Sequence, residues 1–221
     1  GHISRQQPHN DETAIENFSA LLSQCVRERM ISDVPLGAFL SGGIDSSTVV
    51  ALMQKQSTQP VKTFSIGFEV EGYDEAGFAK EIANHLGTEH HEMYVTPRDA
   101  LDVIPDLPRI YDEPFADISQ IPTYLVSKFA REHVTVAVSG DGGDELLGGY
   151  RRHFMIPPIW DKLNKLPPSL RKGLGRVIST LHPGGLNALW PKRDILLSDS
   201  VAKLSGLMRQ DDWVGVHDFL L

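Results

Sequence analysis

Cysteine, long apolar runs and clustered basic residues are scarce or missing in this chain of 221 residues. The single cysteine, Cys25, allows no internal disulfide, which is typical of a reducing compartment, so we expect a cytoplasmic protein. No run of about 18 apolar residues is present, and we expect no membrane-spanning helix and no signal peptide. The formal net charge of −8 argues against a broad nucleic-acid face, which needs clustered Lys and Arg.

Two common nucleotide motifs are also missing. The chain has no GxxxxGK[ST] sequence and no GxGxxG after a strand, so it is neither a Walker-type NTPase nor a Rossmann protein by these tests. It starts with Gly1-His2 instead of Met, which is typical of a cloning remnant, and we expect a piece of a longer protein. With 41% hydrophobic and 23% charged residues, it has the composition of a globular protein that buries a core.

The most informative stretch is a glycine-rich turn between a predicted strand, Val34–Leu40, and a predicted helix, Ser46–Gln54. The first N–H groups of a helix lack partners inside it, and glycines let a ligand approach the backbone, so the turn predicts a polyphosphate site. Asp45 would repel phosphate unless a divalent cation lay between them, and we therefore expect it to hold Mg²⁺. The candidate ligand contacts are Leu40, Ser41, Gly42, Gly43, Asp45, Ser46 and Ser47.

Strand and helix patterns alternate along the first two thirds of the chain. This order predicts an α/β fold with a parallel twisted sheet, helices on both faces and ligands at the carboxyl ends of the strands. Further strands are expected at Val61–Phe68, Glu89–Val95 and Val134–Val138, and helices at Pro97–Ile110 and Tyr124–Arg131.

An N-terminal helix is expected as well. A capping box of Thr13 and Glu16 is one way to start it, with Asn10 and Asp11 as rival caps. Apolar residues recur along it at helical spacing, and Cys25 falls within this stripe, so we expect Cys25 to be a small core residue.

A second glycine-rich turn follows the predicted strand Val134–Val138. The segment Ser139–Tyr150 contains Asp141, Asp144 and several glycines, and it also lies at the carboxyl end of a strand. Two such turns on one parallel sheet would face a common crevice. There, Asp45 and Asp144 would hold Mg²⁺ from opposite sides.

The first turn resembles the PP-loop of ATP pyrophosphatases, SGGxDS. Together the two turns resemble the synthetase domain of glutamine-dependent asparagine synthetases, whose second motif is Ser-Gly-Glu-Gly-x-Asp-Glu-x-Phe-Gly-Gly-Tyr. The likeness covers roughly Phe18–His153. It implies an adenine nucleotide alpha hydrolase-like fold, with Leu40 and Ile66 framing adenosine and Ser139 and Gly140 contacting the nucleotide. Asp141 stands where the family has Glu, a residue associated with forming the acyl-adenylate.

The resemblance also implies a reaction and partners. Aspartate, ATP and ammonia would give asparagine, AMP and pyrophosphate through β-aspartyl-AMP, with ammonia made from glutamine by an N-terminal glutaminase domain. We expect the PP-loop domain at residues 11–153 and a helical extension, a truncated part of the same domain, at 154–221. Because the family's glutaminase and a later catalytic lysine have no match here, we expect this piece to turn over poorly. The sequence leaves a homodimer open.

Several readings stay open. His85, His90 and His91 lack the fixed spacing of a zinc site, so structural roles are favoured, and they match the family stretch His-Leu-Gly-Thr-x-His-His-Glu. The acidic loop Tyr111–Asp117 is either solvated or borders the active site. The Asp141 substitution keeps open another carboxylate acceptor, as in β-lactam synthetases or polysaccharide and peptide pathways. Another PP-loop class and a non-catalytic nucleotide-binding domain are the remaining alternatives.

Overall fold

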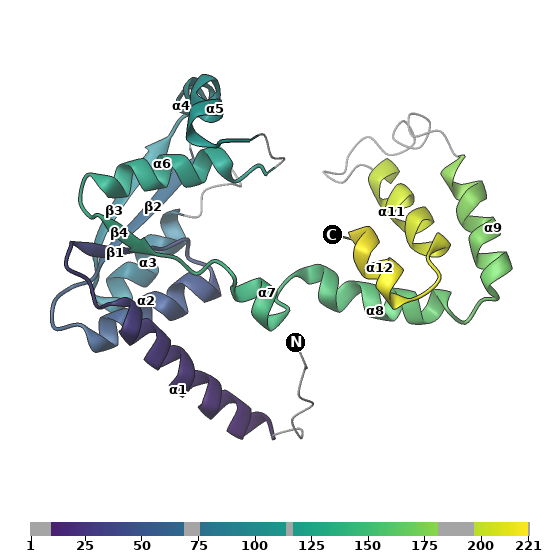
Figure 1. The fold of residues 1–221 in the computed structure, drawn as a ribbon, viewed down its shortest axis with the longest axis horizontal. Coiled ribbons are helices and arrows are strands. Elements are labelled where there is room, and N and C mark those ends of the chain that lie inside the picture. The colour runs from purple at the N-terminus through teal and green to yellow at the C-terminus, as the bar shows by residue number, and fades with distance from the viewer. Residues whose placement is uncertain (1–9, 69–75, 114–116, 181–196, 221) are drawn as a thin grey trace. The chain divides into compact units, whose positions relative to one another are not determined.

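The computed structural model describes residues 10–68, 76–113, 117–180 and 197–220, which form two compact units (Figure 1). The N-terminal unit contains the sheet and ends at Gly143, and the C-terminal unit starts at Asp144 and is helical. The middle of the acidic loop, residues 114–116, lies outside the described residues. Within the described ranges, every helix is too short or too polar to span a lipid bilayer.

Four parallel strands form the sheet, in the order β3-β2-β1-β4. This arrangement confirms the predicted parallel α/β sheet. At its centre Ala38 pairs with Thr63 on one side and with Val138 on the other, so β1 lies between β2 and β4. The strands are β1 (Leu36–Phe39), β2 (Lys62–Phe68), β3 (Glu89–Val95) and β4 (Val136–Val138). The bounds of β3 are the predicted ones, whereas the other three strands begin one or two residues later.

The helices of this unit start largely where the sequence provides a cap or a proline. Asn10, a rival of the expected capping box, is the N-cap of the first helix, because its side chain accepts a hydrogen bond from the Thr13 N–H. Thr96 and Asp99 form a capping box at α4, with Pro97 at its first position. The helices are α1 (Asp11–Arg29), α2 (Ile44–Gln56), α3 (Ala76–Leu86), α4 (Pro97–Val103), α5 (Leu107–Ile110) and α6 (Gln120–Arg131).

The single helix expected at Pro97–Ile110 is broken into three pieces. A 3₁₀ turn, η1 (Ile104–Asp106), separates α4 from α5, and prolines stand at positions 105 and 108. Proline has no N–H to donate, so a continuous helix would lose hydrogen bonds at both places. At α6 the opposite happens: the helix starts four residues before the expected Tyr124, because Pro122 falls in its first turn, where no N–H partner is needed.

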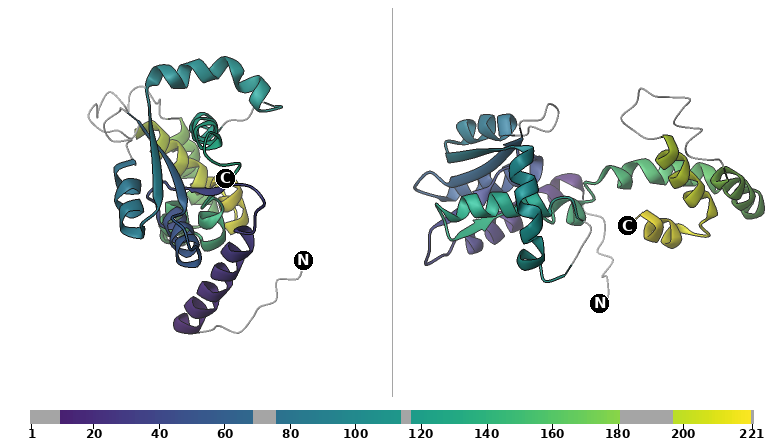
Figure 2. Two further views of the ribbon diagram at one scale, coloured as in Figure 1. Left: turned by 90° about the vertical axis from the view of Figure 1, so that its left-hand side faces the viewer. Right: turned by 90° about the horizontal axis from the view of Figure 1, so that it is seen from above.

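Helices cover both faces of the sheet (Figure 2). On one face, Val26 of α1, Val50 of α2 and Ala79 of α3 pack with Ala38 and other residues in one core cluster. On the other face, α4, α5 and α6 cover two clusters, one around Phe64 and one around Val95. The two glycine-rich turns follow the carboxyl ends of β1 and β4.

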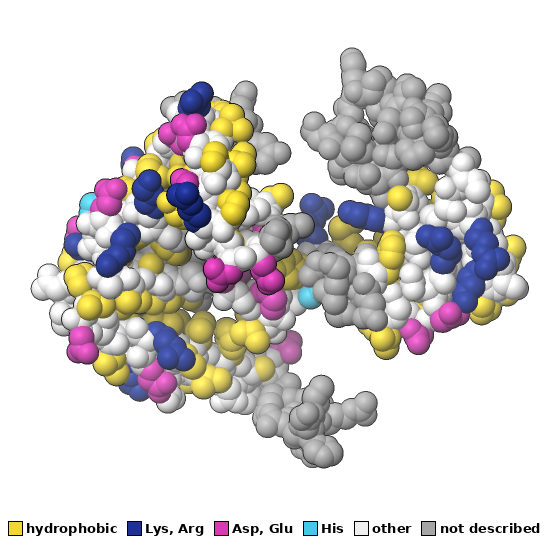
Figure 3. Space-filling view, turned by 45° about the horizontal axis from the view of Figure 1, so that its top comes forward, with side chains coloured by type: hydrophobic (Ala, Val, Ile, Leu, Met, Phe, Trp, Pro, Cys, Tyr) yellow, Lys and Arg dark blue, Asp and Glu magenta, His cyan; other side chains and the backbone are white. Residues whose placement is uncertain are grey.

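The expectation that Cys25 is a core residue is wrong, because Cys25 is exposed. Only part of the apolar stripe of α1 reaches the core, where Val26 is buried and Leu22 and Met30 are partly buried. The side chains of Ile15 and Leu21 remain 67% and 61% exposed. On the face drawn in Figure 3, acidic and basic side chains are interspersed over this unit.

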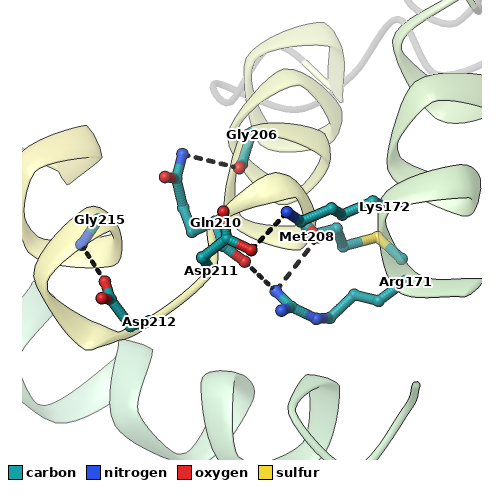
Figure 4. A network of polar contacts seen from close by, with 8 residues as sticks. All are labelled: Arg171, Lys172, Gly206, Met208, Gln210, Asp211, Asp212 and Gly215. Atoms are coloured by element: carbon teal, nitrogen blue, oxygen red, sulfur yellow. Dashed lines mark hydrogen bonds and ion pairs between the residues drawn. The ribbon is translucent and has the colours of Figure 1, made fainter. Parts of the chain in front are cut away.

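In the C-terminal unit a buried arginine connects three helices. Arg171 is 1% exposed, and its guanidinium lies 4.5 Å from the centre of the Trp160 ring. It donates to the carbonyls of Met208 (3.2 Å) and Gln210 (2.6 Å), where it neutralises the negative end of a helix (Figure 4). The helices that follow β4 are α7 (Gly143–Leu147), α8 (Arg151–Leu163), α9 (Pro168–Ser179), α11 (Leu197–Arg209) and α12 (Trp213–Leu220).

Candidate active site

The first glycine-rich turn connects β1 to α2 and is held by its own serines. Ser46 is buried; its hydroxyl accepts from the Ser41 N–H (3.2 Å) and donates to the Gly43 carbonyl (3.2 Å). The hydroxyl of Ser47 donates to the same carbonyl at 2.6 Å. Both serines are candidate ligand contacts, and in this structure their hydroxyls close the turn. The backbone N–H groups at the start of α2 are then the main anion-binding groups that the turn can offer.

Gly42 is required at its position for two reasons. Its φ of 82° lies in the left-handed region, which side chains other than glycine rarely adopt. A Cβ on Gly42 would also lie 2.9 Å from Phe78 Cβ and 3.0 Å from the backbone nitrogen of Ala79. The turn therefore rests directly on the first turns of α3. Phe78 was not among the predicted site residues, and its side chain is 66% exposed.

The second glycine-rich turn begins after β4 and packs directly onto the first. A Cβ on Gly140 would lie 2.6 Å from the backbone nitrogen of Ser46 and 2.9 Å from its Cα. A Cβ on Gly143 would lie 2.6 Å from the carboxylate carbon of Asp45. Because β1 and β4 are parallel neighbours, their carboxyl ends bring the two turns together. The structure thus joins the predicted residues Asp45, Ser46 and Gly140 in one place.

The carboxylate of Asp45 lies in the first turn of α2, where the helix dipole favours a negative charge. It makes no hydrogen bond or ion pair with any other described residue, so its oxygens are free to bind a cation. Carboxylate oxygens are the ligands that Mg²⁺ prefers, so this residue fits the predicted metal. Asp141 is exposed within the second turn, where its backbone N–H donates weakly to the Ser139 hydroxyl at 3.4 Å.

Asp144 is the first residue of the C-terminal unit, so its predicted pairing with Asp45 around a metal stays a prediction. Within its own segment, Asp144 lies against the glycine pair Gly148-Gly149. The Gly149 N–H donates to the Asp144 carbonyl at 3.0 Å, and a Cβ on Gly149 would overlap the Asp144 carboxylate. The Tyr150 hydroxyl donates to Glu145, and Gly148 has a φ of 68°. The second half of the motif therefore forms a tight helical turn, α7, that needs its glycines.

The side chains of Leu40 and Ile66, which were expected to frame adenosine, do not converge. Leu40 is 1% exposed and packs in the cluster with α1, α2 and α3, whereas Ile66 packs in the cluster of the opposite face. Leu40 continues the ladder beyond β1, because its N–H donates to the Phe64 carbonyl at 2.9 Å. If both residues frame one base, they do so through their main-chain groups at the strand ends.

The contacts of His90 and His91 agree with the structural roles that we expected for the histidines. His90 lies between hydroxyls, with Nδ1 2.9 Å from the Thr63 Oγ1 and Nε2 3.2 Å from the Ser65 Oγ. Burial lowers the pKa of His90, and nearby Glu92 opposes this shift. His91 points to the other face, where it stacks on Phe64 and packs against His133 with the rings tilted. In the described part of the chain, no three His, Cys, Asp or Glu residues are grouped as metal ligands.

A hollow of about 420 Å³ lies beside the first turn, on the side of α2 and α3. Gly42, Ser47 and Thr48 line it from the turn and α2, and Ile82 and His85 line it from α3. Sequence patterns gave no sign of it, since its walls are the outer faces of two helices. Gly143 was also missed, because the motif leaves its position open and only its contact with Asp45 distinguishes it.

The chain is similar to known proteins over most of its length. A family model described as asparagine synthase matches residues 17–215. The putative asparagine synthetase [glutamine-hydrolyzing] 2 of Methanocaldococcus jannaschii is 48% identical over 164 residues, 74% of this chain and 32% of that protein. Asparagine synthetase [glutamine-hydrolyzing] 1 of Bacillus subtilis is 42% identical over 174 residues, 79% of this chain and 27% of that protein. The chain therefore spans about a third or less of the length of these relatives.

Among solved structures, an NH3-dependent NAD synthetase from Campylobacter jejuni aligns with a TM-score of 0.43 and 17% sequence identity. The alignment covers 61% of this chain and 60% of that one.

Proposed function

Because the chain belongs to the asparagine synthase family, we propose that it is the ATP-binding, amide-forming part of an asparagine synthetase. A side-chain carboxylate oxygen of aspartate attacks the α-phosphorus of ATP, the bond to the β-phosphate oxygen breaks, and pyrophosphate leaves. Ammonia then attacks the acyl carbon of β-aspartyl-AMP, the bond from that carbon to the phosphate oxygen breaks, and nitrogen loses a proton. The products are asparagine and AMP.

The observation that carries this proposal is the direct contact between the two glycine-rich turns. Gly140 lies against the Ser46 backbone and Gly143 against the Asp45 carboxylate, at the carboxyl ends of neighbouring parallel strands. That edge is where such sheets bind ligands. The N–H groups at the start of α2 would hold the leaving pyrophosphate, and donors fixed before the reaction stabilise developing charge well.

Magnesium is part of the proposed function, and Asp45 and Asp144 are its proposed ligands. When bound, Mg²⁺ would neutralise charge on the pyrophosphate. The place of Asp45 in the first turn of α2, without a hydrogen bond or ion pair to any other described residue, supports this assignment. Ammonia is proposed to come from glutamine, because the relatives are named as glutamine-hydrolyzing enzymes. The relatives are also about three to four times as long as the part they share with this chain, which leaves room in them for a glutaminase domain.

Calorimetry with ATP, with and without Mg²⁺, tests the nucleotide site. We expect Asp45→Ala to weaken binding at least about tenfold when Mg²⁺ is present and to change little without it, as for the loss of a metal ligand. Asp102→Ala is the matched control, because it removes the same charge from an exposed carboxylate of α4. Equal affinity of the wild type and Asp45→Ala in Mg²⁺ would contradict the metal assignment.

Pyrophosphate release with a panel of carboxylic acids tests the acceptor. We expect release to require aspartate. Asp141 favours a second candidate, a related acid as acceptor, because its side chain is one CH₂ shorter than the glutamate that the family motif carries there. Release with another acid, shifted toward aspartate by Asp141→Glu, would favour that candidate. ATP binding without release for any acid would leave a nucleotide-binding domain as the function of this chain.

A further inference from the structure

The glycines of the second turn serve two different purposes. Gly142 and Gly148 have φ values of 91° and 68°, which explains why glycine stands there. Gly140 and Gly143 do not have a positive φ, so the backbone alone would accept alanine at both positions. Glycine is needed at these two positions because they contact the first turn. Gly140 meets backbone atoms of Ser46, whereas the three atoms nearest to a Cβ on Gly143 all belong to the side chain of Asp45.

Gly143 is packed against the whole carboxylate group. A Cβ there would lie 2.6 Å from the carboxylate carbon of Asp45 and 2.9 Å from each of its two oxygens. Separations below about 3.0 Å are not found for real Cβ atoms, so a side chain at this position and the present Asp45 rotamer exclude each other. Among the described residues, no hydrogen bond or ion pair holds the carboxylate in its place. Packing against Gly143 is therefore the restraint that the structure does show.

We propose that Gly143 is a positioning residue that fixes the rotamer of Asp45 and thereby sets the affinity of the metal site. The inference rests on the proposed function for its metal, whereas the contact itself belongs to the free protein. The family motif leaves this position open, so the assignment comes from the geometry alone. Any side chain at 143 would push the carboxylate away from its present place, and a ligand displaced by an ångström binds a metal less well.

The rotamer of Asp45 in the free protein gives the first test. Three-bond scalar couplings of Asp45 are measured by NMR in the wild type, Gly143→Ala and Gly77→Ala. Gly77 is the matched control, because a Cβ there meets no atom of the described residues within 4 Å. We expect one Asp45 rotamer in the wild type and in Gly77→Ala, and a different one in Gly143→Ala. An unchanged rotamer in Gly143→Ala would overturn the proposal, whatever the protein binds.

The second test is a double-mutant cycle on ATP affinity in Mg²⁺. We expect Gly143→Ala to weaken binding about tenfold in the wild type, as typical of residues that orient a metal ligand, and not at all in the Asp45→Ala background. An equal loss in both backgrounds would show that Gly143 acts by another route and would overturn the proposal. A wild type that binds no Mg²⁺–ATP would instead refute the proposed function, and the couplings would still decide the role of Gly143.

The same two substitutions, Gly143→Ala and Asp45→Ala, also show whether a folding defect comes from the proposed contact. If Gly143→Ala alone does not fold, the added Asp45→Ala substitution should restore folding, because it removes the three atoms that lie nearest to the new methyl group. Failure of the double variant to fold would place the conflict elsewhere and would overturn the proposal.

Discussion

The two glycine-rich turns have similar sequences but are stabilised in different ways. The first, Ser41–Ser47, is closed by hydroxyl groups, since Ser46 and Ser47 both donate to the carbonyl of Gly43. The second, Ser139–Gly143, has only a weak side-chain hydrogen bond at Asp141 and is shaped by glycines that fit against the first. The first turn can therefore hold its own shape, whereas the second takes its position from its neighbour. Substitutions in the two turns should therefore destabilise the protein for different reasons.

Gly140→Ala should cause the largest loss, because it tests the contact between the turns. The new Cβ would meet the backbone nitrogen and Cα of Ser46, and a backbone cannot rotate away as a side chain can. We expect a loss of about 3 kcal/mol in the free energy of unfolding, the upper range for inserting a methylene into a packed site, together with loss of ATP binding. Urea unfolding followed by fluorescence measures the first, and calorimetry the second.

Gly77→Ala serves as the control for this experiment. A Cβ at Gly77 meets nothing within 4 Å, and Gly77 lies in α3, where alanine is the better helix former. We expect it to be neutral or to gain up to about 1 kcal/mol. If Gly140→Ala were as stable as this control, the close packing of the two turns would be wrong.

Ser46→Ala should have the next largest effect and should act on the first turn. Ser46 is 7% exposed, and without its hydroxyl the Ser41 N–H loses its partner, whereas the Gly43 carbonyl still accepts from Ser47. We expect a loss of about 2 kcal/mol in the free energy of unfolding, the cost of leaving a partly buried N–H group unpaired. Ser47→Ala should cost about 0.5–1 kcal/mol, because its single bond is closer to solvent. Equal losses in the same urea experiment would contradict the central role of Ser46.

Gly142→Ala isolates the backbone requirement of the second turn. A Cβ at Gly142 meets nothing within 4 Å, so only its φ of 91° opposes a side chain. We expect a loss of about 1 kcal/mol in the free energy of unfolding, smaller than for Gly140→Ala. Gly142→Asn should recover part of it, since asparagine tolerates positive φ better than alanine. A larger loss than for Gly140→Ala would reverse our assignment of the two glycines.

Part of this structure could be predicted from the sequence, and part could not. Both turns, the parallel sheet and the bounds of β3 were predictable, because strands, glycines and helix starts leave local signals. The exposure of Cys25 was not, since helical spacing shows that a face is apolar but not that another element covers it. Nor was the contact of Gly143 with Asp45, which depends on how β4 is registered beside β1. Local patterns thus predicted each turn, and tertiary packing decided what each turn touches.

The smallest expected effect is a loss of stability at acidic pH. It concerns the face of the sheet on which the first turn rests. His90 lies on the face that α3 covers, and α3 supports Gly42. Burial lowers the pKa of His90 in the folded protein below its ordinary value near 6.5, so the folded state disfavours the charged form. The associated stability is complete above about pH 6.5 and is lost as the pH falls from there through the folded-state pKa. Urea midpoints of the wild type and His90→Gln at pH 7.5 and 5.5 measure this effect. We expect the wild type to lose more stability than the variant over that interval, whereas equal losses would mean that other groups carry the acid sensitivity.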